Sequence, residues 1–310
     1  MTVHIVTDST SDIPKQIAEE LGITVIPLTI TFGAESFRDG VDLSADEYFT
    51  RLAATKQLPT TSQAPPALFQ YTYEHLISRG EVVSVHLSHK FSGTIESARN
   101  AARDIAPDKI TVVDSSSVSM GLGMCVIAAA RAAKVGASRA ECAAAAESVA
   151  GRLHVSVAFE TLEYLRRGGR IGRASAFVGG LLRLKPILTV KDGEAFPVTR
   201  VRSRAKAIDE LFDLTAKFEK IDEICVLHTT TPDDAAALAK RVEAARPGVP
   251  LLLGRFGPVL GVYGGPGMLG IAVVEGSSRN RQPSSEPVTL RSRVISGFSP
   301  NLDELAPSED

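Results

Sequence analysis

The stretch Val82 to Asn100, VVSVHLSHKFSGTIESARN, contains the arrangement that decides the fold of this chain. Its apolar start, Val82 to Leu87, predicts a buried strand. A turn follows through Ser88 to Phe91, and a helix is predicted from about Gly93. The residues on one face of that helix are apolar: Ile95, Ala98, Ala102 and Ile105. A strand leading directly into a helix is the repeating unit of an α/β sheet.

Two hydroxyl residues, Ser92 and Thr94, lie at the start of this predicted helix. In an open α/β sheet, ligands bind where strands end and helices begin. Free backbone N–H groups and the positive end of the helix dipole favour an anion there. Hydroxyl residues at this position are also ordinary helix caps. The stretch alone therefore leaves two interpretations: Ser92 binds an anionic ligand, or it only caps the helix.

The same alternation of strand and helix patterns continues around this stretch and predicts a parallel-sheet α/β domain over residues 1–150. Residues 151–276 mix strands, helices and a hairpin signal at Asp192–Gly193, which predicts a second domain of the α+β class. After Gly276 the composition shifts to Ser, Arg, Pro and Glu, so residues 277–310 are expected to be a disordered tail.

The composition narrows the class of protein. The chain has 310 residues, 44% of them apolar, and a net charge of −2. Aromatic residues make up 5%, Trp is absent, and no recognition motif is present, so we expect no nucleic-acid partner. The start of the chain lacks the pattern of a signal peptide, and no apolar stretch is long enough to span a bilayer. Three sparse cysteines fit a reducing compartment. We therefore expect a cytoplasmic protein with at most transient membrane contact.

A second hydroxyl cluster, Thr60, Thr61 and Ser62, lies between prolines. Hydroxyl groups donate hydrogen bonds without adding net charge. Burying a ligand carboxylate is costly unless it is hydrogen-bonded, and hydroxyls together with a helix N-terminus would meet that need. The same residues are ordinary turn formers, so a plain turn remains the alternative interpretation.

Basic residues are concentrated between Leu165 and Lys206, where eleven Lys and Arg oppose only Asp192 and Glu194, a local charge of +9. A field of this kind attracts an acidic partner or a phosphate group. An ordinary solvated face is the alternative. Within this region, the apolar segment Phe177 to Leu184 is a candidate pocket wall, as is the Ala-rich helix near Met120 to Ala130.

In its motifs the chain resembles the DegV family of fatty-acid-binding proteins. The resemblance spans about Val3 to Glu275, nearly the whole chain except the tail, and each motif is weak alone but specific in this order. The motifs are Asp8–Asp12, Thr61–Gln63, Leu87–Ser88, Phe91–Thr94, Asp114–Ser115, Arg167–Ile171, Gly257–Val259 and Gly265–Gly267.

This resemblance implies a two-domain DegV-like fold with a long-chain fatty acid buried between the domains. It implies that Thr61 and Ser92 hold the ligand carboxylate, with Ser62 and the backbone near Gly93 as helpers. It further implies a role in bacterial phospholipid synthesis: the protein presents the carboxylate to a separate, dihydroxyacetone-kinase-like fatty acid kinase, which makes an acyl-phosphate. Arg170 matches the family arginine of the Gly-Gly-Arg-Ile motif, and Arg202 aligns with a second family arginine, a position for which Arg200 and Arg204 compete. Arg170 and Arg202 are expected to bind the partner kinase.

The chain departs from the family pattern at one position. The family usually has Gly-x-His-x-Gly-Pro-Gly near its end, and Tyr263 stands here in place of the histidine. A phenol donates a hydrogen bond without carrying a charge. Tyr263 is therefore an expected ligand-binding residue with a different chemistry from that of the family.

On this interpretation the protein is a carrier with no catalytic residues, no cofactor and no metal. An enzyme remains the main alternative: a metal-dependent phosphotransferase or hydrolase that uses Asp8 and Asp12, which flank the polar segment after the first strand. A protein that binds an acidic macromolecule through the basic region is a further alternative.

Overall fold

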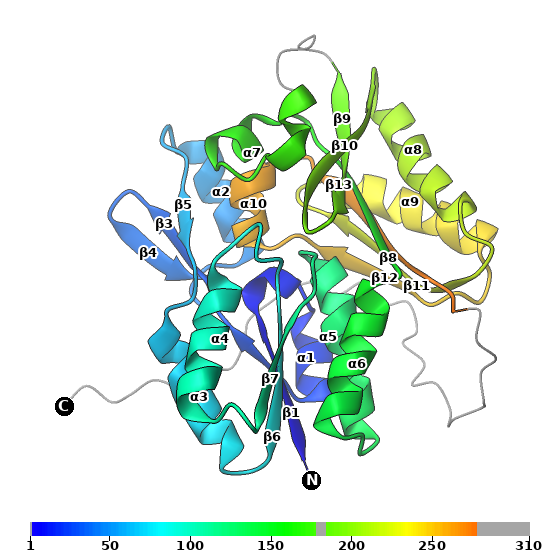
Figure 1. Ribbon diagram of the computed structural model, residues 1–310. Coiled ribbons are helices and arrows are strands. Elements are labelled where there is room, and N and C mark those ends of the chain that lie inside the picture. Colours follow the sequence, from blue (N-terminus) through cyan, green and yellow to red (C-terminus); the bar gives the residue numbers. More distant parts are fainter. Residues whose placement is uncertain (1, 178–183, 278–310) are drawn as a thin grey trace.

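The structure is a computed structural model that describes residues 2–177 and 184–277, in which three sheets pack together with helices (Figure 1). The expected tail, apart from Ser277, lies outside the described residues. So does most of the candidate wall from Phe177 to Leu184.

The first sheet has four parallel strands in the order β2-β1-β6-β7, and it confirms the predicted parallel α/β architecture. Its strands are β1 (Val3–Asp8), β2 (Ile23–Ile26), β6 (Glu81–His86) and β7 (Ile110–Asp114). The central strand β1 pairs Ile5 with Ile23 on one side and Val83 on the other. Its helical elements are η1 (Ser9–Ser11), α1 (Lys15–Leu21), α3 (Pro66–Ile77), α4 (Thr94–Ile105), α5 (Met120–Lys134) and α6 (Arg139–Ala150).

A small antiparallel sheet of β3 (Thr29–Phe32), β4 (Glu35–Arg38) and β5 (Thr60–Ser62) branches from the first sheet, with α2 (Ala45–Ala54) beside it. Residues 23–32 form two strands in different sheets and not one continuous strand. Pro27 lacks a backbone N–H to donate to a strand ladder. The chain therefore leaves β2 before Pro27 and starts β3 in another sheet. A turn at Gly33, where φ is +61°, then allows β4 to pair back.

The six-stranded sheet has the order β10-β9-β8-β13-β11-β12. Its strands are β8 (Leu153–Ala158), β9 (Lys185–Lys191), β10 (Glu194–Val201), β11 (Ile221–His228), β12 (Leu251–Arg255) and β13 (Leu269–Glu275). Asp192 and Gly193 join β9 and β10 with φ of +52° and +78°, which confirms the predicted hairpin. The helical elements of this part are α7 (Glu163–Arg167), η2 (Gly172–Phe177), α8 (Arg204–Ala216), α9 (Pro232–Ala245) and α10 (Pro258–Gly264).

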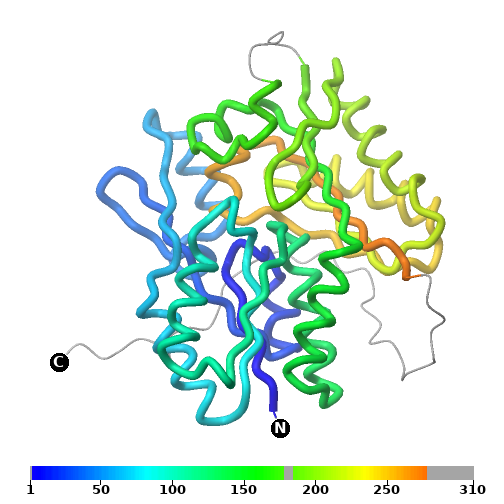
Figure 2. The backbone as a smooth tube through the Cα atoms, viewed as in Figure 1, coloured from blue at the N-terminus to red at the C-terminus, as the bar shows by residue number. Residues whose placement is uncertain are grey.

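The short helix α10 joins the two halves of the molecule. Figure 2 shows it, in orange, beside the blue segment that contains α2 and β5. Val259 and Val262 of α10 belong to a hydrophobic cluster made otherwise of N-terminal residues, among them Tyr48 and Phe49. A second cluster contains residues of both the first sheet and the six-stranded sheet. The boundary at 150/151 separates the strands of the two larger sheets, but packing crosses it, and the boundary stays a prediction.

Candidate functional site

A cavity of about 140 Å³ lies between the two halves of the protein. Close-packed interiors contain few voids larger than a water molecule, so a cavity of this size is not an ordinary packing defect. The N-terminal wall comes from the carboxyl ends of β1, β6 and β7 and from β5. The C-terminal wall comes from β8, β9, the start of β10, α7, α10 and the residues around them.

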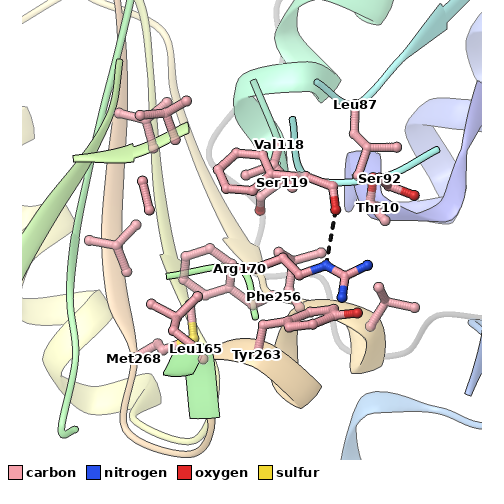
Figure 3. A pocket seen from close by; sticks show the side chains of 18 of the residues that line it. Thr10, Leu87, Ser92, Val118, Ser119, Leu165, Arg170, Phe256, Tyr263 and Met268 are labelled. Carbon is pink, nitrogen blue, oxygen red and sulfur yellow. Dashed lines mark hydrogen bonds between the residues drawn. The ribbon is translucent and has the colours of Figure 1, made fainter. Parts of the chain in front are cut away.

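Most side chains that line the cavity are apolar. They are Leu28, Leu87, Phe91, Val118, Val155, Val157, Phe159, Leu165, Leu188, Val190, Ala195, Phe256, Val259, Leu260 and Met268. In Figure 3, Ser92, the Arg170 guanidinium and the Tyr263 hydroxyl gather at one side, whereas Leu165 and Met268 lie at the other. The cavity therefore has a polar end and a long apolar body, as small-molecule sites with one polar group commonly do.

Thr61 and Tyr263 form a hydrogen-bonded pair at the polar end. Thr61 Oγ1 and Tyr263 Oη are 2.5 Å apart, and either can donate. Thr61 is placed by β5, where it pairs with the fully buried Ile30 of β3. Tyr263 comes from α10, whose Gly261 lies against α2: a methyl group at Gly261 would be 2.5 Å from Tyr48 Cε1. The bond therefore joins the N-terminal and C-terminal halves directly.

Ser92 and Thr94 form the second hydroxyl pair, with their oxygens 2.9 Å apart. Ser92 Oγ also accepts from the Thr94 N–H at 3.2 Å, at the first residue of α4. The Ser92 N–H donates to the Ser88 carbonyl, which fixes the turn between β6 and α4. Ser92 thus makes a local hydrogen bond that stabilises the turn before α4, whose N-cap is Gly93, and it also lines the cavity.

The two pairs together leave hydroxyl protons available for a ligand. A hydroxyl has one proton to donate and two lone pairs. Within each pair one hydroxyl donates to the other, and no other acceptor is found for the second proton among the described residues. The polar end therefore offers two uncommitted O–H donors, which suit a ligand acceptor such as a carboxylate.

Other hydroxyls that line the cavity already donate to groups inside the protein. Thr10 donates to Asp8 Oδ1 at 2.5 Å, and Thr189 donates to the Val155 carbonyl at 2.6 Å. Ser119 donates to Asp12. The hydroxyl protons of these three residues are therefore committed, so these residues offer no further O–H donor to a ligand carboxylate.

Arg170 supplies a positive charge at the polar end. Its Nε donates to the Phe91 carbonyl at 3.1 Å and its Nη1 to the Gly168 carbonyl at 2.8 Å. The guanidinium lies 5.1 Å from the centre of the Tyr263 ring, a cation–π arrangement (Figure 3). Because Phe91 precedes Ser92, Arg170 links the Ser92 turn to the Tyr263 ring.

Asp8, one of the two carboxylates in the alternative enzyme interpretation, belongs to a buried network. Its Oδ1 accepts from the Thr10 N–H and hydroxyl, and its Oδ2 lies 2.8 Å from His86 Nδ1. His86 Nε2 is 2.7 Å from Ser84 Oγ, to which Tyr73 donates. In residues 2–177 and 184–277, no three His, Cys, Asp or Glu side chains form a group that could hold a metal ion.

The structure brings together some of the sequence-predicted residues and not others. Thr61, Ser92, Tyr263 and Arg170 all line the cavity. Ser62, Gly93 and Arg202 are not among the lining residues. Ser62 and Arg202 are exposed.

Gly93 has a structural reason to be glycine. A methyl group there would lie 2.3 Å from Gln63 Oε1, and the Gln63 amide donates to Ser97 Oγ at 3.1 Å. The Gln63 side chain therefore covers Gly93 and connects the end of β5 to the first turns of α4.

Sequence reasoning missed most of the apolar body. Val155 and Val157 project from β8, and Phe256 follows β12. Their patterns are those of ordinary core strands, so nothing in the sequence separates a cavity wall from a packed interior. Met120–Ala130, expected as a wall, lies next to the cavity through Val118 and Ser119 rather than lining it itself.

None of the described helices combines the length and the apolar character that crossing a membrane requires. All three cysteines are buried and free.

Comparison with known families gives one match over nearly the whole chain. Residues 2–276 match the family described as "Uncharacterised protein, DegV family". A DegV domain-containing protein of Streptomyces coelicolor is 39% identical over 277 residues, which are 87% of this chain and 98% of that protein. One from Mycobacterium tuberculosis is 36% identical over 287 residues, 90% of this chain and 99% of that protein.

Solved structures of DegV family and fatty-acid-binding proteins are also similar to this chain. A DegV family protein from Thermus thermophilus, described by its fatty acid binding, has a TM-score of 0.82 and 36% identity, covering 89% of this chain and all of that one. DegV from Bacillus subtilis, described as a fatty acid binding protein, has a TM-score of 0.81 and 32% identity with the same coverage. A stearic acid-binding protein from Eubacterium ventriosum has a TM-score of 0.81 and 26% identity, covering 88% of this chain and 98% of that one.

Proposed function

This chain belongs to the DegV family, and from that membership we propose that it binds a long-chain fatty acid in the cavity between its two halves. The fatty acid binding described for the Thermus thermophilus and Bacillus subtilis relatives supports this proposal. The observation that carries it is the polarity of the cavity: an apolar body ends at two uncommitted hydroxyl donors.

In this proposal the carboxylate lies at the polar end and the acyl chain fills the apolar body. The Thr61–Tyr263 pair donates one hydrogen bond to the carboxylate and the Ser92–Thr94 pair donates another. Hydrogen bonds to a charged group stabilise by roughly 1.5–3 kcal/mol each. Arg170 adds an attractive charge at the same end, while each further buried methylene of the chain contributes about 0.8 kcal/mol.

Mass spectrometry of the purified protein tests the proposal directly. A species of fatty-acid mass should be released when the protein is denatured, and the protein stripped of lipid should take up added palmitate. In Ser92→Ala, palmitate affinity should fall by about tenfold or more, the loss expected for one hydrogen bond to a carboxylate.

Ser148→Ala is a matched control, since Ser148 is an exposed serine within α6 and is not among the residues that line the cavity. Its affinity should equal that of the wild type. A protein that carries no lipid and takes up no palmitate contradicts the proposed function, and a Ser92→Ala variant with unchanged affinity contradicts the assignment of the site.

We further propose that the bound carboxylate is presented to a dihydroxyacetone-kinase-like fatty acid kinase, so that the protein acts as a carrier subunit without catalysis of its own. Arg170 is exposed at the polar end, and Arg202 is exposed on the segment between β10 and α8. Both lie in the basic region, whose charge of +9 suits a partner that carries ATP phosphates or an acidic face.

Reconstitution with such a kinase from the same cell tests this step. ATP, palmitate and both proteins should yield acyl-phosphate, trapped as a hydroxamate. Arg202→Ala should lower the yield without changing palmitate affinity, because Arg202 does not line the cavity. An unchanged yield would remove Arg202 from the proposed interface, and acyl-phosphate made without any kinase would show that the protein has catalysis of its own.

A further inference from the structure

The helix that carries Tyr263 is packed tightly in the N-terminal half of the protein. Helix α10 contributes Val259, Leu260, Tyr263 and Gly264 to the cavity wall. A methyl group on Gly261 would lie 2.5 Å from Tyr48 Cε1 and 3.0 Å from Phe49 Cζ, so the helix backbone rests directly on these rings. A change in where α10 begins would therefore move Tyr263 relative to Thr61.

Two buried carboxyl groups from the N-terminal half hold the start of α10. Asp12 Oδ1 accepts from the Gly257 N–H at 3.0 Å, and Asp39 accepts from the Val259 N–H. Pro258, between them, has no N–H. A methyl group at Gly257 would lie 2.7 Å from Asp12 Oδ1 and 3.9 Å from Asp39 Oδ1, which places both carboxyl groups around this one residue.

Both carboxyl groups are themselves fixed by hydrogen bonds. Ser119 donates to Asp12, and Ser9 donates to Asp39. Asp39 is 3% exposed and Asp12 is 8% exposed. The first N–H groups of a helix have no partner within the helix, so buried ones need an external acceptor. Here the acceptors are Asp12, directly after η1, and Asp39, directly after β4, both more than 200 residues earlier in the chain.

We infer that Asp12 and Asp39 are positioning residues for Tyr263: by holding the Gly257 and Val259 amides they fix α10 so that the Tyr263 hydroxyl meets Thr61. The consequence for ligand affinity rests on the proposed function, whereas the consequence for the place of Tyr263 does not. Neither residue lines the cavity, so each acts through α10 and not by touching the ligand.

Burying two carboxyl groups close to each other costs free energy, and this cost is visible in the raised pKa values of Asp12 and Asp39. Burial raises the pKa of Asp39 to about 7 and raises that of Asp12 well above its usual range, and the neighbouring Asp8 carboxyl adds to both effects. Tyr48 of α2 also faces Asp39, and among residues 2–177 and 184–277 no basic side chain is a cause of the raised pKa of either carboxyl group. Apolar residues of similar size would avoid this cost but would leave the two amides without acceptors.

A double-mutant cycle with palmitate as the probe tests the inference. In the wild-type background, Asp39→Ala should weaken palmitate binding about fivefold or more. In the Tyr263→Phe background the same substitution should weaken binding less than twofold, because the Tyr263 hydroxyl that Asp39 positions is already absent. Asp39→Asn should restore most of the affinity, since the amide oxygen can still accept from Val259. Asp42→Ala is the matched control: Asp42 lies on the same segment, is exposed and pairs with Arg38. Its affinity should equal that of the wild type.

A second readout needs no ligand. Incorporation of 3-fluorotyrosine labels the five tyrosines, and the ¹⁹F resonance of Tyr263 is identified by its loss in Tyr263→Phe. This resonance should shift or broaden in Asp39→Ala and in Asp12→Ala but not in Asp42→Ala. Gly257→Ala, which crowds Asp12 without removing a carboxyl group, should shift it as well, and it serves in place of an aspartate variant that does not fold.

The outcomes separate the inference from the proposed function. An unchanged Tyr263 resonance in folded Asp39→Ala and Gly257→Ala proteins, or equal losses of affinity in the Tyr and Phe backgrounds, overturns the inference. A wild-type protein that binds no palmitate overturns the proposed function, and the resonance of the unliganded protein still decides whether the two carboxyl groups position Tyr263.

Discussion

Thr61 and Tyr263 are 202 residues apart in the chain, yet their hydroxyls are 2.5 Å apart at the polar end of the cavity. The importance of such a pair depends on where its protons go. One proton is used within the pair and the other remains for a ligand. The hydroxyls of Thr10 and Ser119, which also line the cavity, donate to buried aspartates instead. Residue type alone does not distinguish these two groups of hydroxyls.

Replacing Tyr263 by Phe removes the hydroxyl while keeping the ring under Arg170. Palmitate affinity should fall by about tenfold to a hundredfold, because a hydrogen bond to a charged group is worth roughly 1.5–3 kcal/mol and Thr61 also loses its partner. Isothermal titration calorimetry measures the change. Equal affinities for wild type and Tyr263→Phe would assign the carboxylate to Ser92 and Arg170 alone.

Sequence reasoning located four of the residues that line the polar end, Thr61, Ser92, Tyr263 and Arg170. Ser92 followed from its place between a strand and a helix, while Tyr263 and Arg170 followed from resemblance to a family. The cavity body could not be predicted in this way, because Val155 or Phe256 has the pattern of any core residue. The contacts of Asp12 and Asp39 with the start of α10 could not be predicted either, since their partners are backbone amides that follow β12.

At the scale of elements, α10 was missed because it is short and glycine-rich. Gly257-Pro258-Val259-Leu260-Gly261-Val262-Tyr263-Gly264 has few strong helix formers, and glycine disfavours a helix. Tertiary packing overrides that preference. The glycine at position 261 allows α10 to approach Tyr48 and Phe49 closely, and Pro258 suits the first helical position. A longer helix with a regular apolar face gave a clearer pattern: the helix predicted from about Gly93 begins at Thr94 as α4.

Gly261→Ala tests this close approach. The added methyl group would overlap the buried Tyr48 ring, and overpacking of a core typically costs about 1–3 kcal/mol. The melting temperature should fall, and palmitate affinity should fall with it because α10 is displaced. Gly151→Ala is a matched control: a methyl group there would meet its nearest neighbour at 3.6 Å, and its φ of −69° suits alanine. Equal melting temperatures for both variants would contradict the tight packing of α10.

At the scale of the whole molecule, each half supplies groups that hold the other half's part of the site. The C-terminal half holds the Ser92 turn: Arg170 donates to the Phe91 carbonyl, and Ser88, whose carbonyl accepts the Ser92 N–H, donates through its hydroxyl to the Gly193 carbonyl at 2.7 Å. The N-terminal half holds α10 through Asp12 and Asp39. The complete polar end therefore exists only when the two halves are packed together.

The free energy of unfolding should depend on pH, because Asp39 is buried when the protein is folded. Because the pKa of Asp39 is about 7 in the folded protein, against an ordinary value of 3.8, the folded state binds that proton more tightly than the unfolded chain. The contribution of Asp39 to stability is therefore greatest below about pH 4 and decreases as pH rises to about 7.

Asp39→Asn removes this titration. Between pH 5 and pH 8 the melting temperature of the wild type should fall relative to that of Asp39→Asn, by at least about 2 °C, the equivalent of roughly 1 kcal/mol for a protein of this size. Circular dichroism at a series of pH values measures the difference. Melting curves that keep a constant separation over this range would contradict a raised pKa at Asp39.

The position of α10 also has a consequence for how the protein is made. A ribosome releases the N-terminal half first, but the hydrophobic cluster around Tyr48 includes Val259 and Val262. That cluster stays incomplete until nearly all of the described chain has been synthesised. Throughout most of translation the nascent N-terminal half therefore leaves an apolar face uncovered, and such a face is what chaperones recognise and what promotes aggregation.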